Sequence, residues 1–205
     1  MLKETFINLL LKYTGNHSLV QVLWNEIEKS YSHKKRYYHS LLHLENMLQQ
    51  LNEVKDKIQN RDAVLFSLFY HDIVYNVLRS DNEAKSVVVA EKRMKEISVP
   101  TTTIEACSKM ILATAAHNQG RDEDTNYFTD ADLAVLGQDW KTYSLYYNNI
   151  RKEYAVYPNL VYNPGRKKVL AHFLGMDSIY KTDQFRNKFE IKAKENMQRE
   201  LELLS

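Results

Sequence analysis

The feature that most constrains this chain is an eight-residue run, Ala63 to Tyr70 (AVLFSLFY), that is apolar on nearly every side of a helix. A helix without a polar face is stable only when it is buried in a core. The run leads directly into His71 and Asp72, although a buried charge is costly unless it is paired or bound to a metal. The sequence therefore predicts a buried central helix whose end needs chemical partners from elsewhere in the chain.

Residues that form turns are scarce. The 205 residues include only five glycines and three prolines, far fewer than an all-β protein needs. The hydrophobic fraction of 44% is ample for a core, and the charged fraction of 26% is ordinary for a globular protein. Because there is no internal repeat and no long linker, the sequence predicts an all-α protein that folds as one domain over residues 1–205.

Helical periodicity and capping signals divide the chain into segments. Leu41, Leu44 and Leu48, for example, recur at the spacing of one helical face. Polar residues at 119–125 and the prolines and glycine at 157–165 predict loops. The predicted helices span about 2–13, 19–31, 37–58, 63–70, 83–97, 104–116, 128–137, 139–154, 166–174 and 183–204.

Charge and composition indicate the cellular compartment and argue against some classes of partner. The net charge of +2 and the absence of a basic stripe argue against binding to long nucleic acids. The single cysteine, Cys107, excludes an internal disulfide and fits a reducing compartment. No apolar run approaches the ~20 residues of a membrane span, and the N-terminus does not resemble a signal peptide. We therefore expect a cytoplasmic protein without a membrane partner. Self-association into a homo-oligomer remains open.

Two histidines and several aspartates are candidate ligands for one metal ion. They are His43, His71, Asp72 and the pair Asp130 and Asp132. Imidazoles and carboxylates together suit a divalent ion such as Mn, Fe, Zn, Ni, Co or Mg, and the lack of cysteine ligands argues against a structural thiolate zinc site.

His39 and His43 lie four residues apart in the predicted helix 37–58, so we expect both to point the same way. Two interpretations of His39 stay open: it ligates the ion directly, or it orients another ligand.

The order and spacing of these residues resemble the HD-domain phosphohydrolase superfamily. Four strings are similar to a branch described as predicted metal-dependent HD phosphohydrolases: RYYHSLLHL at 36–44, YHDIVY at 70–75, DNEAKS at 81–86 and FTDADL at 128–133. The resemblance covers most of the chain. It implies an HD-like helical bundle with extra C-terminal helices, in which His43, His71, Asp72 and one later aspartate hold a divalent metal.

Which later aspartate is the ligand stays open. The superfamily usually has an Ala-Asp pair followed by an apolar residue, and Asp132 follows Ala131 in this way. Asp130 begins the same string, and a shift of one residue in the alignment would select it instead.

The resemblance implies hydrolysis of a phosphate ester by metal-activated water, on a small phosphorylated metabolite or a nucleotide. Glu83 and His117 are the candidate acid–base residues. Each has a structural alternative, because Glu83 could stabilise the start of its own helix and His117 could cap the end of one. Four basic residues are candidate contacts for the substrate phosphate: Arg79, Lys85, Arg121 and Arg151.

One departure from the family limits this interpretation. Some HD nucleotide hydrolases have acidic residues three and four positions after the HD aspartate, where this chain has Tyr75 and Asn76. The mechanism of that subgroup therefore does not transfer. The alternative function is a regulatory module that binds a metal or a nucleotide without turnover. The basic triplets at 34–36 and 166–168 are interpreted as solvated faces, and the tyrosines at 143–154 as helix packing.

Overall fold

The computed structural model describes residues 1–115, 120 and 122–204. In this part of the chain the secondary structure consists of helices and includes no strand, which confirms the all-α prediction. No helix in these ranges combines the length and the apolar character needed to cross a membrane. By its internal contacts the chain divides into two compact units, Met1–Thr129 and Asp130–Ser205. The expectation of a single domain stays a prediction.

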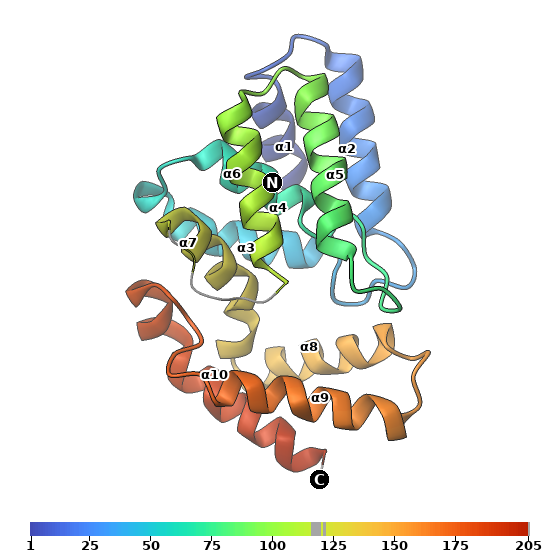
Figure 1. The fold of residues 1–205 in the computed structure, drawn as a ribbon, viewed down its shortest axis with the longest axis vertical. Helices are drawn as coiled ribbons and strands as arrows, with labels where there is room; N and C mark the ends of the chain where they lie inside the picture. Colours follow the sequence, from blue (N-terminus) through green and yellow to red (C-terminus); the bar gives the residue numbers. More distant parts are fainter. Residues whose placement is uncertain (116–119, 121, 205) are drawn as a thin grey trace. The chain divides into compact units, whose positions relative to one another are not determined.

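Unit 1 is built around the predicted central helix. This helix, α4 (Arg61–Tyr70), packs against four other helices, and all of its residues from 63 to 70 are buried as predicted (Figure 1). The helices and short 3-10 helix around it are α1 (Leu2–Leu10), α2 (His17–Tyr31), α3 (Leu41–Glu53), η1 (Lys55–Lys57), α5 (Asn82–Glu96) and α6 (Thr101–Ala113), followed by the first part of α7 (Glu123–Leu133).

Local hydrogen bonds explain where α4 starts and how it tolerates a polar residue. The Asn60 side chain accepts a hydrogen bond from the Ala63 N–H at 3.0 Å, which caps the first turn. The buried Ser67 hydroxyl donates to the Ala63 carbonyl at 2.8 Å, so its polar group is satisfied inside the core.

The predicted helix 37–58 is wrong at its beginning. Residues 37–40 are not helical, and Ser40 has an extended backbone with φ −119° and ψ 178° immediately before α3 begins at Leu41. His39 therefore lies outside the helix, and the argument that His39 and His43 share a helical face fails. The periodicity of the leucines identified the helix but not its first residue.

The helix predicted at 128–137 begins earlier than expected. α7 starts at Glu123, and a short 3-10 helix, η2 (Ala134–Gly137), follows it. The Asp122 carboxylate accepts hydrogen bonds from the Thr125 N–H and hydroxyl, both at 2.8 Å. This is an N-terminal cap, so part of the polar segment that predicted a loop is the first turn of a helix.

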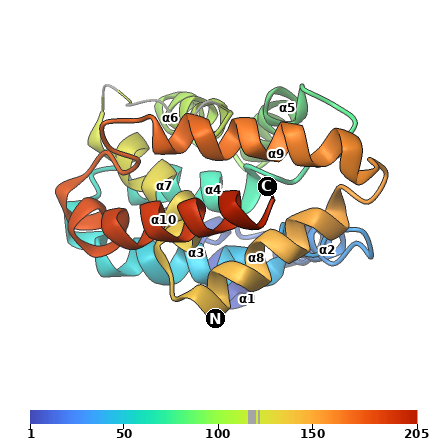
Figure 2. The ribbon, with the colours of Figure 1, turned by 90° about the horizontal axis from the view of Figure 1, so that it is seen from below.

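Unit 2 consists of the end of α7, η2 and three longer helices. α10 packs against both η2 and α9, and α8 packs against η2. Figure 2 labels the three longer helices. Inside the unit, the buried Arg166 side chain forms an ion pair with Glu200, with 2.7 Å between Nε and Oε1. Arg166 is thus not part of a solvated basic face, contrary to the sequence interpretation. The helices are α8 (Trp140–Glu153), α9 (Asn159–Leu174) and α10 (Asp183–Leu203).

The loop predicted at 157–165 is also wrong. Pro158 precedes the first residue of α9, and Pro164 lies inside the helix. A proline in a helix leaves the carbonyl four residues earlier without its usual partner. That carbonyl belongs to Leu160, which is 87% exposed, so water can satisfy it. Because Leu160 is exposed, α9 can continue through Pro164, where the sequence predicted a loop.

Candidate metal centre

The C-terminal end of α4 positions His71. This side chain is only 1% exposed, and its Nδ1 lies 3.0 Å from the Leu68 carbonyl oxygen. A carbonyl oxygen can only accept a hydrogen bond, so Nδ1 carries the proton. In a neutral ring, Nε2 then keeps its lone pair, which is the state that a metal ligand requires.

Two further donor atoms converge on His71 Nε2. His43, buried on α3, places its Nε2 at 3.2 Å, and Asp72 places its Oδ2 at 3.1 Å. Atoms that are each about 2.0–2.3 Å from one ion lie about 2.8–3.8 Å apart at adjacent octahedral or tetrahedral positions. Each of the two separations from His71 Nε2 falls in this range, so His71 could share a divalent ion with either donor.

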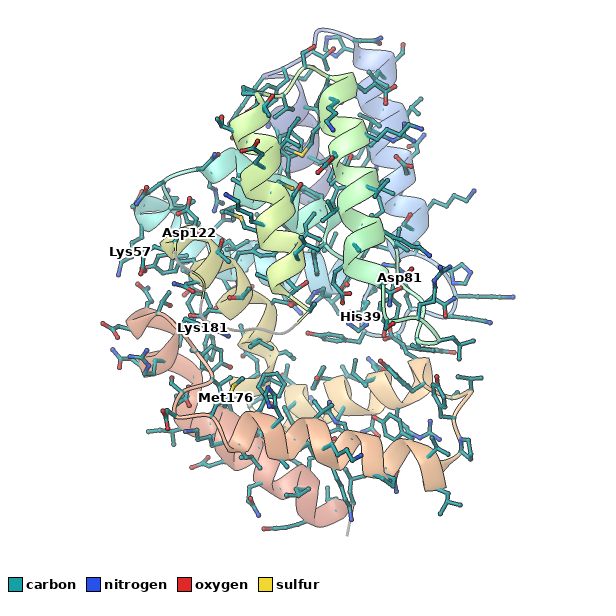
Figure 3. All side chains as sticks on the ribbon, in the orientation of Figure 1. His39, Lys57, Asp81, Asp122, Met176 and Lys181 are labelled. Atoms are coloured by element: carbon teal, nitrogen blue, oxygen red, sulfur yellow. The ribbon has the colours of Figure 1, made fainter. Side chains whose placement is uncertain are left out.

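His39 lies beside this group rather than on α3. Its Nε2 is 3.9 Å from Asp72 Oδ2, and its ring stacks on Tyr75 with the ring centroids 4.1 Å apart. In Figure 3, His39 and Asp81 are labelled on the two loops of unit 1 that precede α3 and α5. The placement of His39 favours the interpretation in which it orients the Asp72 carboxylate.

Three residues that support this group were missed by the sequence reasoning. The Tyr31 hydroxyl accepts a hydrogen bond from the Asp72 N–H at 3.2 Å. Phe128 packs edge-on against the His71 ring, at 5.8 Å between centroids. Arg36, which the sequence placed on a solvated face, is half-buried and donates to the Ile73 carbonyl. Arg36 and Phe128 had a sequence signal, because each begins one of the strings that carry the resemblance, RYYHSLLHL and FTDADL. Tyr31 had none.

The two alternative aspartates have different surroundings. Asp130 is fully buried, and its oxygens accept hydrogen bonds from the Lys181 and Thr182 N–H groups at 2.8 Å and from the Thr182 hydroxyl at 2.7 Å. Burial raises the pKa of Asp130, while these hydrogen bonds oppose that rise. Asp130 therefore fixes the residues just before α10. Figure 3 labels Lys181 there.

Asp132 is half-buried in the last turn of α7. Two imidazoles with a carboxylate are a donor set that could hold a metal ion. Asp132 belongs to unit 2, and its role as a ligand, like that of Asp72, stays a prediction.

The predicted phosphate contacts are engaged with neighbouring residues of the chain. Arg79 and Lys85 both pair with Asp81, at 2.9 Å and 3.0 Å, on the surface of unit 1. In unit 2, Arg151 donates to Asn159 and to two backbone carbonyls, which ties α8 to the start of α9.

The structure describes one of the two predicted acid–base residues, Glu83. Glu83 is half-buried in the first turn of α5, where a carboxylate also stabilises its own helix. His117 and Arg121 lie outside the described residues.

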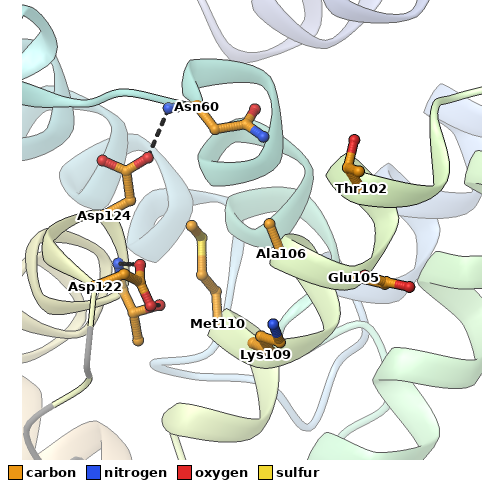
Figure 4. Close-up of a pocket in the computed structure, with 9 residues that line it drawn as sticks. Asn60, Thr102, Glu105, Ala106, Lys109, Met110, Asp122 and Asp124 are labelled. Carbon is orange, nitrogen blue, oxygen red and sulfur yellow. Dashed lines mark hydrogen bonds between the residues drawn. The ribbon is translucent and has the colours of Figure 1, made fainter.

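A separate pocket of about 280 Å³ lies in unit 1, between α6 and the beginnings of α4 and α7 (Figure 4). Two of its carboxylates already have structural partners. Asp124 accepts hydrogen bonds from the Gln59 and Asn60 N–H groups at 2.8 Å and 2.6 Å, and Asp122 caps α7. None of the residues that line the pocket is a predicted site residue.

No protein-family model, no curated protein and no solved structure matches this chain. The functional interpretation therefore rests on the residues and their geometry, together with the sequence resemblance.

Proposed function

We propose that this protein is a metal-dependent phosphohydrolase of the HD type, in which His43, His71, Asp72 and Asp132 hold one divalent ion. The substrate is a small phosphorylated metabolite, with nucleotides among the candidates. The observation that carries the proposal is the convergence of His43 Nε2 and Asp72 Oδ2 on His71 Nε2, at 3.2 Å and 3.1 Å.

The choice of Asp132 over Asp130 follows from the geometry of one helix. Residues four apart lie on the same side of a helix, whereas residues two apart lie about 200° apart around its axis. Phe128 packs on His71, and Asp132 comes four residues later in the same uninterrupted helix. Asp130 is two residues from each, and its carboxylate is occupied by Lys181 and Thr182. Phe128 and Asp132 thus share one face of α7, and this supports the choice of Asp132 as the ligand.

A divalent ion supplies charge neutralisation at a phosphoryl group and activates water as a nucleophile. The chain supplies the orientation of the donors. The Leu68 carbonyl fixes the tautomer of His71, and the Tyr31 hydroxyl holds the backbone of Asp72. Phe128 packs edge-on against the His71 ring, which is only 1% exposed. Arg79 and Lys85 can bind a substrate phosphate if it replaces the Asp81 carboxylate that both now contact.

The same contacts in unit 1 have a simpler explanation. A doubly protonated His71 could donate to Leu68 and to Asp72 and form a structural ion pair without a metal. The two explanations differ in whether the protein takes up a divalent ion and is stabilised by it.

The test is a metal analysis of the protein purified without chelators and without a metal-affinity tag. We expect about one divalent ion per chain in the wild type and loss of that ion in His43→Ala. His172→Ala, which removes an exposed histidine of α9, should retain it. A wild-type protein that contains no ion, and that is not stabilised by added Mn²⁺, Co²⁺ or Zn²⁺, would contradict the proposal.

Activity is tested separately with the metal-loaded protein. We expect turnover of generic phosphate esters or nucleotides with Mn²⁺ or Co²⁺, and no turnover by His43→Ala. Tight nucleotide binding without turnover across a broad screen would favour the regulatory module instead.

A further inference from the structure

We propose that Arg36 is a positioning residue for the candidate metal centre, and that its guanidinium fixes the direction in which Asp72 presents its carboxylate. The inference rests on the proposed function. Arg36 belongs to a basic run, 33–36, in which Lys34 and Lys35 are exposed and Arg36 is half-buried. A turn closed by the Arg36 N–H and the His33 carbonyl, at 2.8 Å, directs the arginine into unit 1.

The Arg36 guanidinium joins two loops that meet at the site. Its Nη2 donates to the Ile73 carbonyl at 2.9 Å, and its Nη1 donates to the His39 carbonyl at the longer distance of 3.4 Å. Ile73 directly follows Asp72, so the arginine connects the residue after one predicted ligand with the segment that leads into α3. Asp72 lies beyond the end of α4, in a single turn that the Ile73 N–H and the Tyr70 carbonyl close at 3.2 Å.

Two tyrosine rings extend this connection to the backbone of Asp72 and to His39. The guanidinium carbon lies 4.8 Å from the centroid of the Tyr31 ring and 5.5 Å from that of Tyr75. The Tyr31 hydroxyl accepts a hydrogen bond from the Asp72 N–H, and the Tyr75 ring stacks on His39. Arg36 therefore contacts Tyr31, which binds the backbone of Asp72, and Tyr75, which contacts the neighbouring His39.

These contacts require an arginine. A guanidinium is flat and permanently charged, and it offers several donors at fixed angles. It can therefore bind two carbonyl oxygens at its edge while aromatic rings lie against it. A lysine at position 36 keeps the charge, but its single ammonium group cannot reproduce this arrangement. If the arginine sets the direction of Asp72, its replacement by lysine should weaken metal binding more than it weakens the fold.

Arg61 provides a matched control in the same unit. It is also half-buried, and its Nη1 donates to the Leu51 carbonyl at 3.0 Å. It lies at the opposite end of α4 from His71. Arg36→Lys and Arg61→Lys thus each remove a bond between a guanidinium and a carbonyl, but only the first lies at the candidate centre.

The experiment measures the dissociation constant for Mn²⁺ or Zn²⁺, by calorimetric titration of metal-free full-length protein, together with the melting temperature of each variant. Residues that orient metal ligands typically change affinity by about 10–100-fold when they are replaced. We expect a loss of that size in Arg36→Lys and unchanged affinity in Arg61→Lys, at comparable melting temperatures. Wild-type affinity in Arg36→Lys, or an equal loss in both variants, would overturn the inference. A wild type that binds no metal would contradict the proposed function instead.

Discussion

At the level of single residues, two aspartates near the end of α7 have different surroundings. Asp130 and Asp132 lie two positions apart in one helix, so their side chains leave it in nearly opposite directions. Asp130 is fully buried and holds the backbone at 181 and 182. Asp132 shares the helical face of Phe128, which packs against His71. Asp130 therefore stabilises the fold, and we propose that Asp132 binds the metal.

This assignment predicts opposite effects of the two conservative replacements. Asp130→Asn puts an NH₂ group where a carboxylate oxygen now accepts up to three hydrogen bonds, so it should lower the free energy of unfolding by about 1–3 kcal/mol. It should leave the metal content unchanged. Asp132→Asn should lose most of the metal with little change in the stability of the metal-free protein. Urea denaturation and metal analysis of both variants check this, and loss of metal from Asp130→Asn alone would reverse the assignment.

At the scale of elements, a glycine decides how closely η2 and α10 can approach. A β-carbon added to Gly137 would lie 2.5 Å from the Phe189 β-carbon and 2.6 Å from the Phe189 carbonyl oxygen. The second neighbour is backbone, which cannot rotate away. The close contact also places Asn196 of α10 within 2.8 Å of the Leu136 and Gln138 carbonyls, which its side chain amide binds. η2 thus packs closely against α10 and is also hydrogen-bonded to it.

Gly137→Ala should therefore destabilise the protein by about 1–3 kcal/mol or more, as overpacking against backbone usually does. Gly165→Ala is the matched control, because a β-carbon there meets no atom within 4 Å and the residue lies inside α9. That replacement should be neutral or should stabilise by about 0.5–1 kcal/mol, since alanine favours helix more than glycine does. Denaturant midpoints of the two variants measure the difference, and equal midpoints would show that η2 and α10 can separate at no cost.

At the level of the whole protein, stability should depend on pH through carboxylates that accept hydrogen bonds in the folded state. In unit 2, Glu190 accepts hydrogen bonds from the Ile179 and Tyr180 N–H groups, at 3.0 Å and 3.2 Å, and pairs with Lys194. Burial alone would raise the pKa of Glu190, but these partners outweigh it and lower the pKa below its ordinary value. A carboxylate with a lowered pKa stabilises the folded state above its unfolded pKa, and this contribution is lost as the pH falls through its folded pKa.

We therefore expect the wild type to lose stability as the pH falls below about 4.5, and Glu190→Gln to lose less over the same range because its side chain does not titrate. At pH 7 the variant should be less stable by about 1–3 kcal/mol, since one of the backbone donors loses its partner. Glu195→Gln, which alters an exposed pair with Lys192, should follow the wild-type profile. Melting temperatures of the metal-free proteins between pH 3.5 and 7 provide the measurement. Parallel profiles for the wild type and Glu190→Gln would contradict the role of Glu190.

The all-α class and the burial of the central helix could be predicted from the sequence alone, and His43 and Asp72, two of the predicted partners of His71, lie beside it. These follow from local patterns: scarce turn residues, an apolar run, and a polar pair at the end of a helix that must be buried. Helix ends were less predictable, because the start of α7 depends on a side-chain cap and α9 continues through Pro164 where water can replace a backbone partner.

Residues of the same type in the sequence acquire different roles through contacts between distant segments. Arg36 lies among exposed lysines along the chain, and its inward direction depends on a turn and on carbonyls of another loop. Asp130 and Asp132 have the same chemistry and nearly the same neighbours in the sequence. They differ because residues 181 and 182, some fifty positions later, supply donors to one of them. Such contacts between distant segments leave no periodicity in the sequence, since they depend on the packing of helices rather than on the pattern within any one of them.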